Sequence, residues 1–184
     1  MASRLLFSVL LALAASAHAA EVAGVKIDDK VRVADTELSL TGAGLRKRVF
    51  FQVYAIGLYV RDRKADPISQ PGPKRVQIHM LRDVGADPFI DALSEGIKEN
   101  HSEAEAKALE PRVKALGATI AEIKEAKKGM TIALDWNGSA TQVLVDGKPA
   151  GRPIEGEDFY RALLRIWLGD KPVQDDLKKA LLGA

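Results

Sequence analysis

The chain has 184 residues, a formal charge of +2 at pH 7 and no cysteine. Without cysteine, disulfides, thiolate metal sites, iron–sulfur clusters and cysteine nucleophiles are all excluded. Basic residues are interspersed with carboxylates in segments such as 122–128, which is typical of a mixed solvated surface and not of a stripe that follows nucleic-acid phosphates. We therefore expect no nucleic-acid partner.

Residues 1–19 have the three parts of a secretory signal peptide. A positively charged start precedes an apolar run at 5–15, and small residues occupy the two positions at 17–19 that a signal peptidase reads. The apolar run is roughly half of the ~20 residues needed to cross a bilayer, so we expect cleavage and no stable membrane anchor. The mature protein would begin at Ala20 and form a single domain over 20–184.

Strand patterns dominate the first half of this domain. Four stretches have the short β-branched or alternating character of strands: 22–27, 31–34, 38–40 and 75–81. The strongest signal is FFQVYAIGLYV at 50–60, which is aromatic and β-branched throughout. In the strand at 75–81, Gln77 and His79 alternate with apolar residues, which predicts one buried face.

Two helices should follow these strands. The first is expected to begin at Asp87 as N-cap, with Pro88 at its first helical position. The second opens with a capping box at 102–105 and should be kinked or ended early by Pro111.

A hairpin and a second helix pair complete the domain. The hairpin joins 130–136 to 141–145 through Asn137-Gly138, and the last two helices carry apolar stripes at 159–167 and 177–182. Antiparallel strands with helices clustered on one face give an α+β class.

The usual catalytic and metal-binding motifs are missing from the sequence. There is no G-x-S-x-G elbow, Walker loop or H-E-x-x-H, so we expect no cofactor and no metal. His79 and His101 lack a second histidine at helical spacing. His79 either faces a cleft or is a satisfied strand residue. Glu157 and Asp158 precede a helix, where they complement its dipole.

The most unusual stretch is LTGAGLRKRVFFQVYAIGLYV at 40–60. If extended conformation runs back to residue 46, one face carries alternate residues: Arg46, Arg48, Phe50, Gln52, Tyr54 and Ile56. Such a face could hold an amphipathic anion, with Arg46 clamping a carboxylate and apolar side chains lining the tail. A basic loop leading into an ordinary strand explains the same residues, and the periodicity leaves both interpretations open.

Three segments resemble the chalcone isomerase superfamily, most closely its bacterial secreted branch: GAGLRKR…FFQVYAIGLYV, SEGIKEN and GEDFYRALLRIWLGDKPVQDDLKKALLG. The resemblance implies an open-faced β-sandwich, in which a large antiparallel sheet carries helices on one face and a ligand cleft lies between them. It also implies a periplasmic location. Members of the superfamily include plant enzymes that close a chalcone into a flavanone, fatty-acid binders, and proteins without known catalysis.

The resemblance carries over only part of the enzyme site. The G-x-G-x-R pattern of the family's anion-binding arginine falls on Arg46. The strand threonine of the enzymes aligns with Tyr54. The enzymes' helix tyrosine and asparagine fall either on Leu93 and Asn100 or on Asp83 and Ile90, and a late hydroxyl falls on Ile166. We therefore expect no chalcone isomerase activity.

Our leading hypothesis is a periplasmic protein that binds a small amphipathic anion such as a fatty acid. Arg46 would be the charge clamp, and Tyr54 and Gln52 would add hydrogen bonds. Three residues would form apolar walls: Phe89, Leu93 and Ile166. One rival is an isomerase or lyase that uses the same cleft. Another has no ligand, and the helix that carries Trp167 would then dock onto a partner protein of the envelope.

Overall fold

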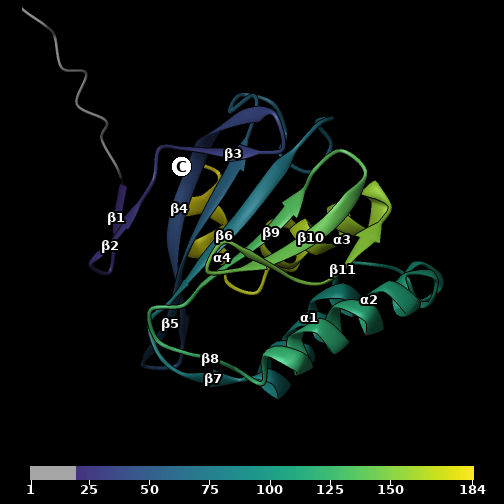
Figure 1. Cartoon of the computed structure of the whole chain (residues 1–184). Coiled ribbons are helices and arrows are strands. Elements are labelled where there is room, and N and C mark those ends of the chain that lie inside the picture. The colour runs from purple at the N-terminus through teal and green to yellow at the C-terminus, as the bar shows by residue number, and fades with distance from the viewer. Residues whose placement is uncertain (1–19) are drawn as a thin grey trace, which may run out of the picture.

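The computed structural model describes residues 20–184, so the predicted signal peptide at 1–19 lies outside the described residues. Its centre is a curled antiparallel sheet of seven strands in the order β11-β10-β9-β6-β5-β4-β3 (Figure 1). The strands of this sheet are β3 (Lys30–Val33), β4 (Thr36–Arg48), β5 (Phe51–Val60), β6 (Lys74–Met80), β9 (Thr131–Trp136), β10 (Ala140–Val145) and β11 (Lys148–Glu155).

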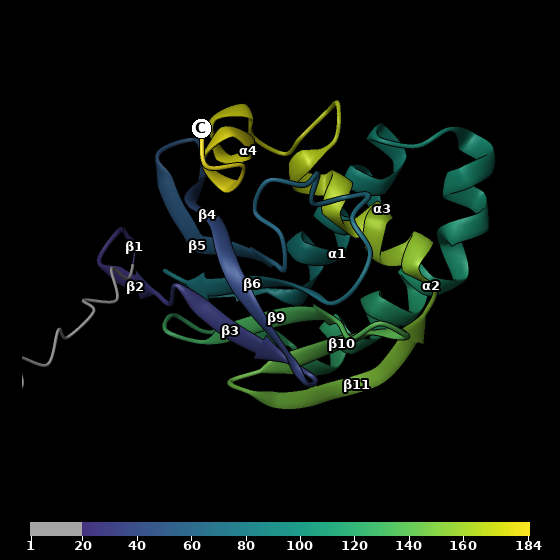
Figure 2. The same ribbon diagram turned by 90° about the horizontal axis from the view of Figure 1, so that it is seen from above.

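Within residues 20–184, four helices and two small two-stranded sheets complete the fold. The helices are α1 (Ala86–Glu99), α2 (Glu103–Ile123), α3 (Glu157–Leu168) and α4 (Asp175–Leu181). One small sheet is the hairpin of β1 (Ala20–Val22) and β2 (Val25–Ile27), and the other pairs β7 (Val84–Gly85) with β8 (Glu125–Ala126), which α1 and α2 separate in the chain. Figure 2 shows the helices gathered on one side of the curled sheet. The predicted α+β class, with a large antiparallel sheet and helices on one face, is confirmed.

The sheet buries apolar residues on both faces at the end that holds β4 and β5. Tyr54, Ile56 and Leu58 of β5 belong to the main core with the helices, whereas Ala55 and Tyr59 belong to a second cluster beneath β1 and β2. This alternation follows from the two-residue period of a strand. Because both faces of β5 are buried, its sequence is a nearly continuous apolar run.

Gly42 and Gly44 allow α4 to pack directly onto β4. A Cβ atom on Gly42 would lie 2.8 Å from the Leu181 carbonyl oxygen, and one on Gly44 would lie 2.6 Å from Leu177 Cδ1. The strand also shifts register between Leu40 and Gly42, as expected for a bulge. The two glycines therefore give α4 the close approach that places its N-terminus beside Arg46.

The predicted strand at 50–60 corresponds to β5, but extended conformation does not run back from it to residue 46 without a break. A two-residue turn at Val49-Phe50 separates β4 from β5, and Val49 has a φ of 54°. Apolar turn residues gave no turn signal, because Gly, Asn and Asp are the usual residues at such positions. The predicted strand at 22–27 is likewise divided into β1 and β2 by a turn with positive φ at Ala23 and Gly24.

Helix boundaries also differ from the expectations. Helix α1 begins at Ala86 with Gly85 as its N-cap, so Asp87 lies inside the first turn. Helix α2 has the predicted capping box at Ser102, but it continues through Pro111 to Ile123. Pro111 is exposed, so water can satisfy the carbonyl group that loses its helical partner.

Strand β11 has no counterpart in the sequence prediction. It contains Pro149 and Pro153, which argue against a strand because proline cannot donate a ladder hydrogen bond. The structure places β11 at the edge of the sheet, where one side of the strand needs no partner.

Candidate functional site

Arg46 and Tyr54 lie directly opposite each other on the neighbouring strands β4 and β5. Opposed residues of an antiparallel pair project from the same face. The Tyr54 side chain is buried in the main core below the helices, and Arg46 is half-buried at the margin of that core. Arg46 and Tyr54 therefore share a face as opposed residues of two strands, and not as alternate residues of one strand.

The Arg46 guanidinium is held by Gln174, the N-cap residue of α4. Arg46 Nη1 donates to Gln174 Oε1 at 3.2 Å, and it also donates to the carbonyl oxygen of Lys47. The Lys47 backbone N–H donates to the same Gln174 oxygen at 2.9 Å, while Gln174 Nε2 donates to the Leu45 carbonyl at 3.1 Å. One amide oxygen thus accepts hydrogen bonds from a cation and from a backbone N–H.

Tyr54 is tied to α3 through Trp167. Trp167 Nε1 donates to the Tyr54 hydroxyl oxygen at 3.1 Å in the interior. Burial raises the pKa of Tyr54, while the hydrogen bond from Trp167 and the charge of Arg46 act in the opposite direction. The hydroxyl therefore stays protonated at neutral pH and can donate its own hydrogen.

The expected apolar walls lie in the same core. Leu93 and Ile166 are buried, and Phe89 is partly buried against the cluster that contains Tyr54. A Cβ atom on Gly96 would lie 2.9 Å from Ile166 Cγ1, so α1 and α3 are in close contact. This region between sheet and helices is filled by side chains.

Gln52 lies apart from this group. It pairs with Lys47, beyond a second register shift in the β4–β5 ladder, and its side chain is exposed near the turn. Its proposed hydrogen bond to a ligand stays a prediction.

Residues 19–183 match the family model described as chalcone isomerase-like. The chain belongs to this family. Among solved structures, the fatty-acid binding protein of Arabidopsis thaliana is similar with a TM-score of 0.67 and 14% sequence identity. The match covers 86% of this chain and 92% of that chain, and it shows a shared fold. No curated protein matches the chain.

One of the two registers given by the resemblance aligns Asn100 with the asparagine of the family's enzymes. In the register that retains an asparagine, Asn100 takes a structural role at the end of α1. Its Nδ2 donates to the carbonyl oxygens of Gly96 and Lys171 at 3.0 and 2.9 Å, and its Oδ1 accepts from the Lys171 N–H at 3.0 Å. The amide is therefore occupied by the chain itself.

The sequence does not indicate the roles that Gln174 and Trp167 have beside Arg46 and Tyr54. Gln174 had no sequence signal, since it follows Arg46 by 128 positions. Trp167 was the centre of a possible docking helix, but its side chain is buried and bonded to Tyr54. It is consequently a core residue and not an exposed docking residue.

The other sequence candidates have structural partners. The His79 ring lies 3.1 Å from Gln77 Nε2 and within 3.4 Å of Thr131 Oγ1, and burial lowers its pKa. Asp158 accepts two hydrogen bonds of 2.7 Å from Arg112. Within residues 20–184, no group of three or more His, Cys, Asp or Glu residues could hold a metal ion.

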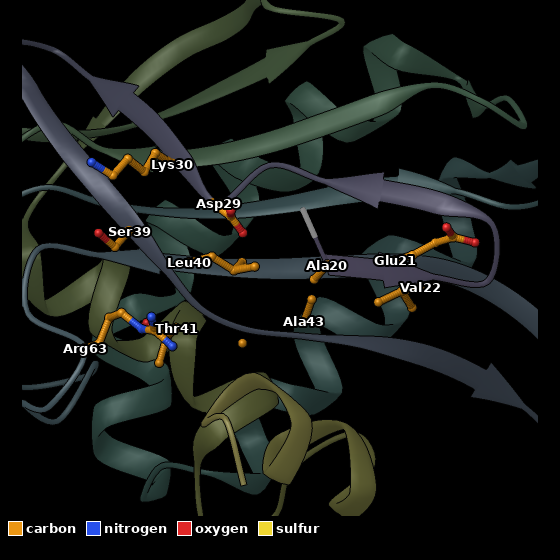
Figure 3. Close-up of a pocket in the computed structure, with 11 residues that line it drawn as sticks. Ala20, Glu21, Val22, Asp29, Lys30, Ser39, Leu40, Thr41, Ala43 and Arg63 are labelled. Carbon is orange, nitrogen blue, oxygen red and sulfur yellow. The ribbon is translucent and has the colours of Figure 1, made fainter. Parts of the chain in front are cut away.

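A pocket of about 610 Å³ lies on the sheet face opposite the helices, between the β1–β2 hairpin and β3–β4. Figure 3 shows Leu40 and Ala20 near its centre, with Lys30 and Arg63 towards one side and Glu21 at the other. Asp29 also lines it, so its charges are mixed. Lys30 is further paired with Glu37 at 2.6 Å, which leaves no concentrated positive charge for an anion.

A smaller pocket of about 300 Å³ lies between α2 and α3. Its basic residues include Arg112 and Arg161, which pair with Asp158 and Glu157. Neither pocket includes any of the six predicted ligand-binding residues. The described helices include none that is long and apolar enough to span a membrane.

Proposed function

We propose that this chalcone isomerase-like protein binds a small amphipathic anion, such as a fatty acid, between its sheet and its helices, and that it does not catalyse a reaction. The observation that carries the proposal is the Gln174 amide oxygen, held 3.2 Å from Arg46 Nη1 and 2.9 Å from the Lys47 nitrogen. These two donors form a ready position for a carboxylate oxygen.

A carboxylate would use the same donors more strongly than Gln174 does. The amide oxygen of Gln174 is a neutral acceptor, whereas a carboxylate has a full negative charge and can accept two parallel hydrogen bonds from the arginine. The ligand therefore displaces the Gln174 side chain from Arg46. The protonated Tyr54 hydroxyl, on the strand beside Arg46, supplies a further donor.

The apolar tail of the ligand needs space that the side chains now fill. Leu93 and Ile166 belong to the same core cluster as Tyr54, and Trp167 is hydrogen-bonded to it, so the tail has to displace side chains of this cluster. Movement of α4 provides the opening, because Gln174 is the N-cap residue of this helix and its side chain is hydrogen-bonded to β4 at Leu45 and Arg46. Ligand binding is thus coupled to a shift of α4 and a new position for the Trp167 ring.

The residues of the site argue against the ring closure that the family's plant enzymes perform. That reaction needs polar groups that orient a water and the ketone near the held phenolate. At the corresponding positions the chain has Leu93 or Asp83 for the tyrosine and Ile166 for the late hydroxyl. The signal-peptide pattern at 1–19 supports a periplasmic location as part of the same proposal.

Isothermal titration of dodecanoate into the chain that begins at Ala20 tests this function. Arg46→Ala should lower the affinity by about tenfold to a hundredfold, since a hydrogen bond to a charged group contributes about 1.5–3 kcal/mol. Arg32→Ala, which removes an exposed arginine from β3, is the matched control and should leave the affinity unchanged. Equal affinity of the Arg46 variant, or no binding by the parent, would refute the proposal.

A further inference from the structure

The turn between β4 and β5 exposes three consecutive large apolar side chains. Val49 is 79% exposed, Phe50 94% and Phe51 59%. The exposed large hydrophobic residues of the described chain comprise these three and Leu182 alone. Figure 1 shows β4 and β5 running to the end of the sheet where β7 and β8 lie, so the turn forms an exposed tip at this end of the sheet.

Turn chemistry does not account for these residues. The turn has two central residues, Val49 and Phe50, and the first has a φ of 54°. Glycine is favoured at that position, and a β-branched residue is strained there. The β10–β11 turn of the same length uses Asp146-Gly147. Strained residues that serve no packing role are typical of functional sites.

Exposed cations adjoin the apolar tip. Arg48 immediately precedes the turn, and the Arg82 guanidinium lies 4.5 Å from the centroid of the Phe51 ring. In residues 20–184, the described ion pairs involve neither arginine. Asp83, the carboxylate next to Arg82, is engaged by Lys127 and by the backbone N–H of Lys128. The tip therefore combines apolar side chains with excess positive charge.

We propose that the Val49–Phe51 tip docks onto the surface of an anionic lipid bilayer. The apolar side chains would enter the boundary between headgroups and acyl chains, and Arg48 and Arg82 would bind lipid phosphates. A convex tip of three residues is too small for a stable protein interface, which needs about 1,000 Å² of buried surface. A bilayer accepts such a wedge, because it closes around the inserted side chains. The inference is independent of what the core binds.

Flotation with vesicles of equal parts phosphatidylglycerol and phosphatidylcholine tests the inference on the chain that begins at Ala20. The parent should bind these vesicles and should bind pure phosphatidylcholine vesicles at least about tenfold more weakly, because the arginines then lack anionic partners. Val49→Gly combined with Phe50→Ser should lower binding to the anionic vesicles by about tenfold or more. This double variant supplies residues that favour the turn, so it should fold at least as well as the parent.

Two further variants make the test specific. Arg48→Glu should weaken binding to anionic vesicles, whereas Leu182→Ser, which removes the exposed apolar residue at the end of α4, should leave it unchanged. Three results would overturn the inference: no binding of the parent to anionic vesicles, full binding by the double variant, or a parent dimer in light scattering that the double variant dissolves. The last result would assign the tip to contact between two copies of the chain.

Discussion

At the scale of single residues, the hydroxyl of Tyr54 has a structural role as the acceptor for Trp167, and we propose that it also binds the ligand. Tyr54→Phe should lower the free energy of unfolding by about 1–3 kcal/mol, because the buried Trp167 N–H loses its acceptor. The same variant should weaken dodecanoate binding. Tyr59→Phe is the matched control, since the Tyr59 hydroxyl is buried without a hydrogen-bond partner and its removal should cost little. Urea unfolding of both variants provides the comparison, and equal losses would contradict the assigned role of Tyr54.

The sequence correctly predicts that Arg46 and Tyr54 lie on one face, but it does so by treating them as residues of a single strand. The G-x-G-x-R pattern and the alternation along 46–56 bring both residues to one face. The structure does so through cross-strand pairing, because Val49 and Phe50 form a turn that carries no turn signal. Gln174 could not be predicted, since its bond to Arg46 depends on the placement of α4, which only tertiary packing determines.

At the scale of secondary-structure elements, the packing of α4 onto β4 requires that residues 42 and 44 be glycines without a Cβ atom. Gly42→Ala would place its Cβ against the carbonyl oxygens of Ala180 and Leu181, so α4 must move. We expect a loss of about 1–3 kcal/mol in unfolding free energy from this overpacking. Gly117→Ala is the control, because a Cβ at this position inside α2 would meet only Ile90 Cγ2 at 3.9 Å, and alanine in a helix should not lower stability. An unaltered stability of the Gly42 variant would show that the contact between α4 and β4 is looser than described.

The elements themselves were predictable where local signals and tertiary context agree. The hairpin at Asn137-Gly138 and the capping box at Ser102 combine strong local chemistry with a consistent pattern, and both are confirmed. Strand β11 was missed because its prolines oppose the assignment, and only its edge position makes them acceptable. Helix α2 passes Pro111 because packing of Leu109 and Leu116 holds both of its halves.

At the scale of the whole molecule, Lys74 gives stability a distinctive dependence on pH. Its side chain is fully buried, with Glu157 Oε1 at 3.5 Å. Burial lowers the pKa of Lys74 in the folded state, and the charge of Glu157 opposes this effect. Above the folded pKa the unfolded chain binds more protons, so this residue adds stability as pH rises towards the pKa of an unburied lysine.

Comparison of the parent with Lys74→Met isolates this effect from other titrations. At neutral pH the variant should be as stable as the parent or more stable, because an apolar residue avoids the cost of the buried charge. The stability of the parent should increase relative to that of the variant as the pH rises from the lowered pKa of Lys74 towards the pKa of an unburied lysine, about 10.4. Chemical denaturation across this range supplies the measurement. A difference that stays constant with pH would contradict the description of Lys74.

The two proposed binding sites also lie close together in the molecule. The apolar tip and the Arg46 site occupy the same end of the β4–β5 pair, only a few residues apart. A bilayer docked at Val49–Phe51 would therefore lie close to the donors that we assign to a carboxylate. This arrangement suits a protein whose ligand partitions into membranes.

A crystal structure with bound dodecanoate tests the central claim most directly. We predict a carboxylate oxygen within hydrogen-bond distance of Arg46 and of the Lys47 nitrogen, with the Gln174 side chain moved away and the tail beside Leu93 and Ile166. A carboxylate held instead by Lys30 or Arg63 in the pocket on the opposite face, with Gln174 still bonded to Arg46, would contradict it.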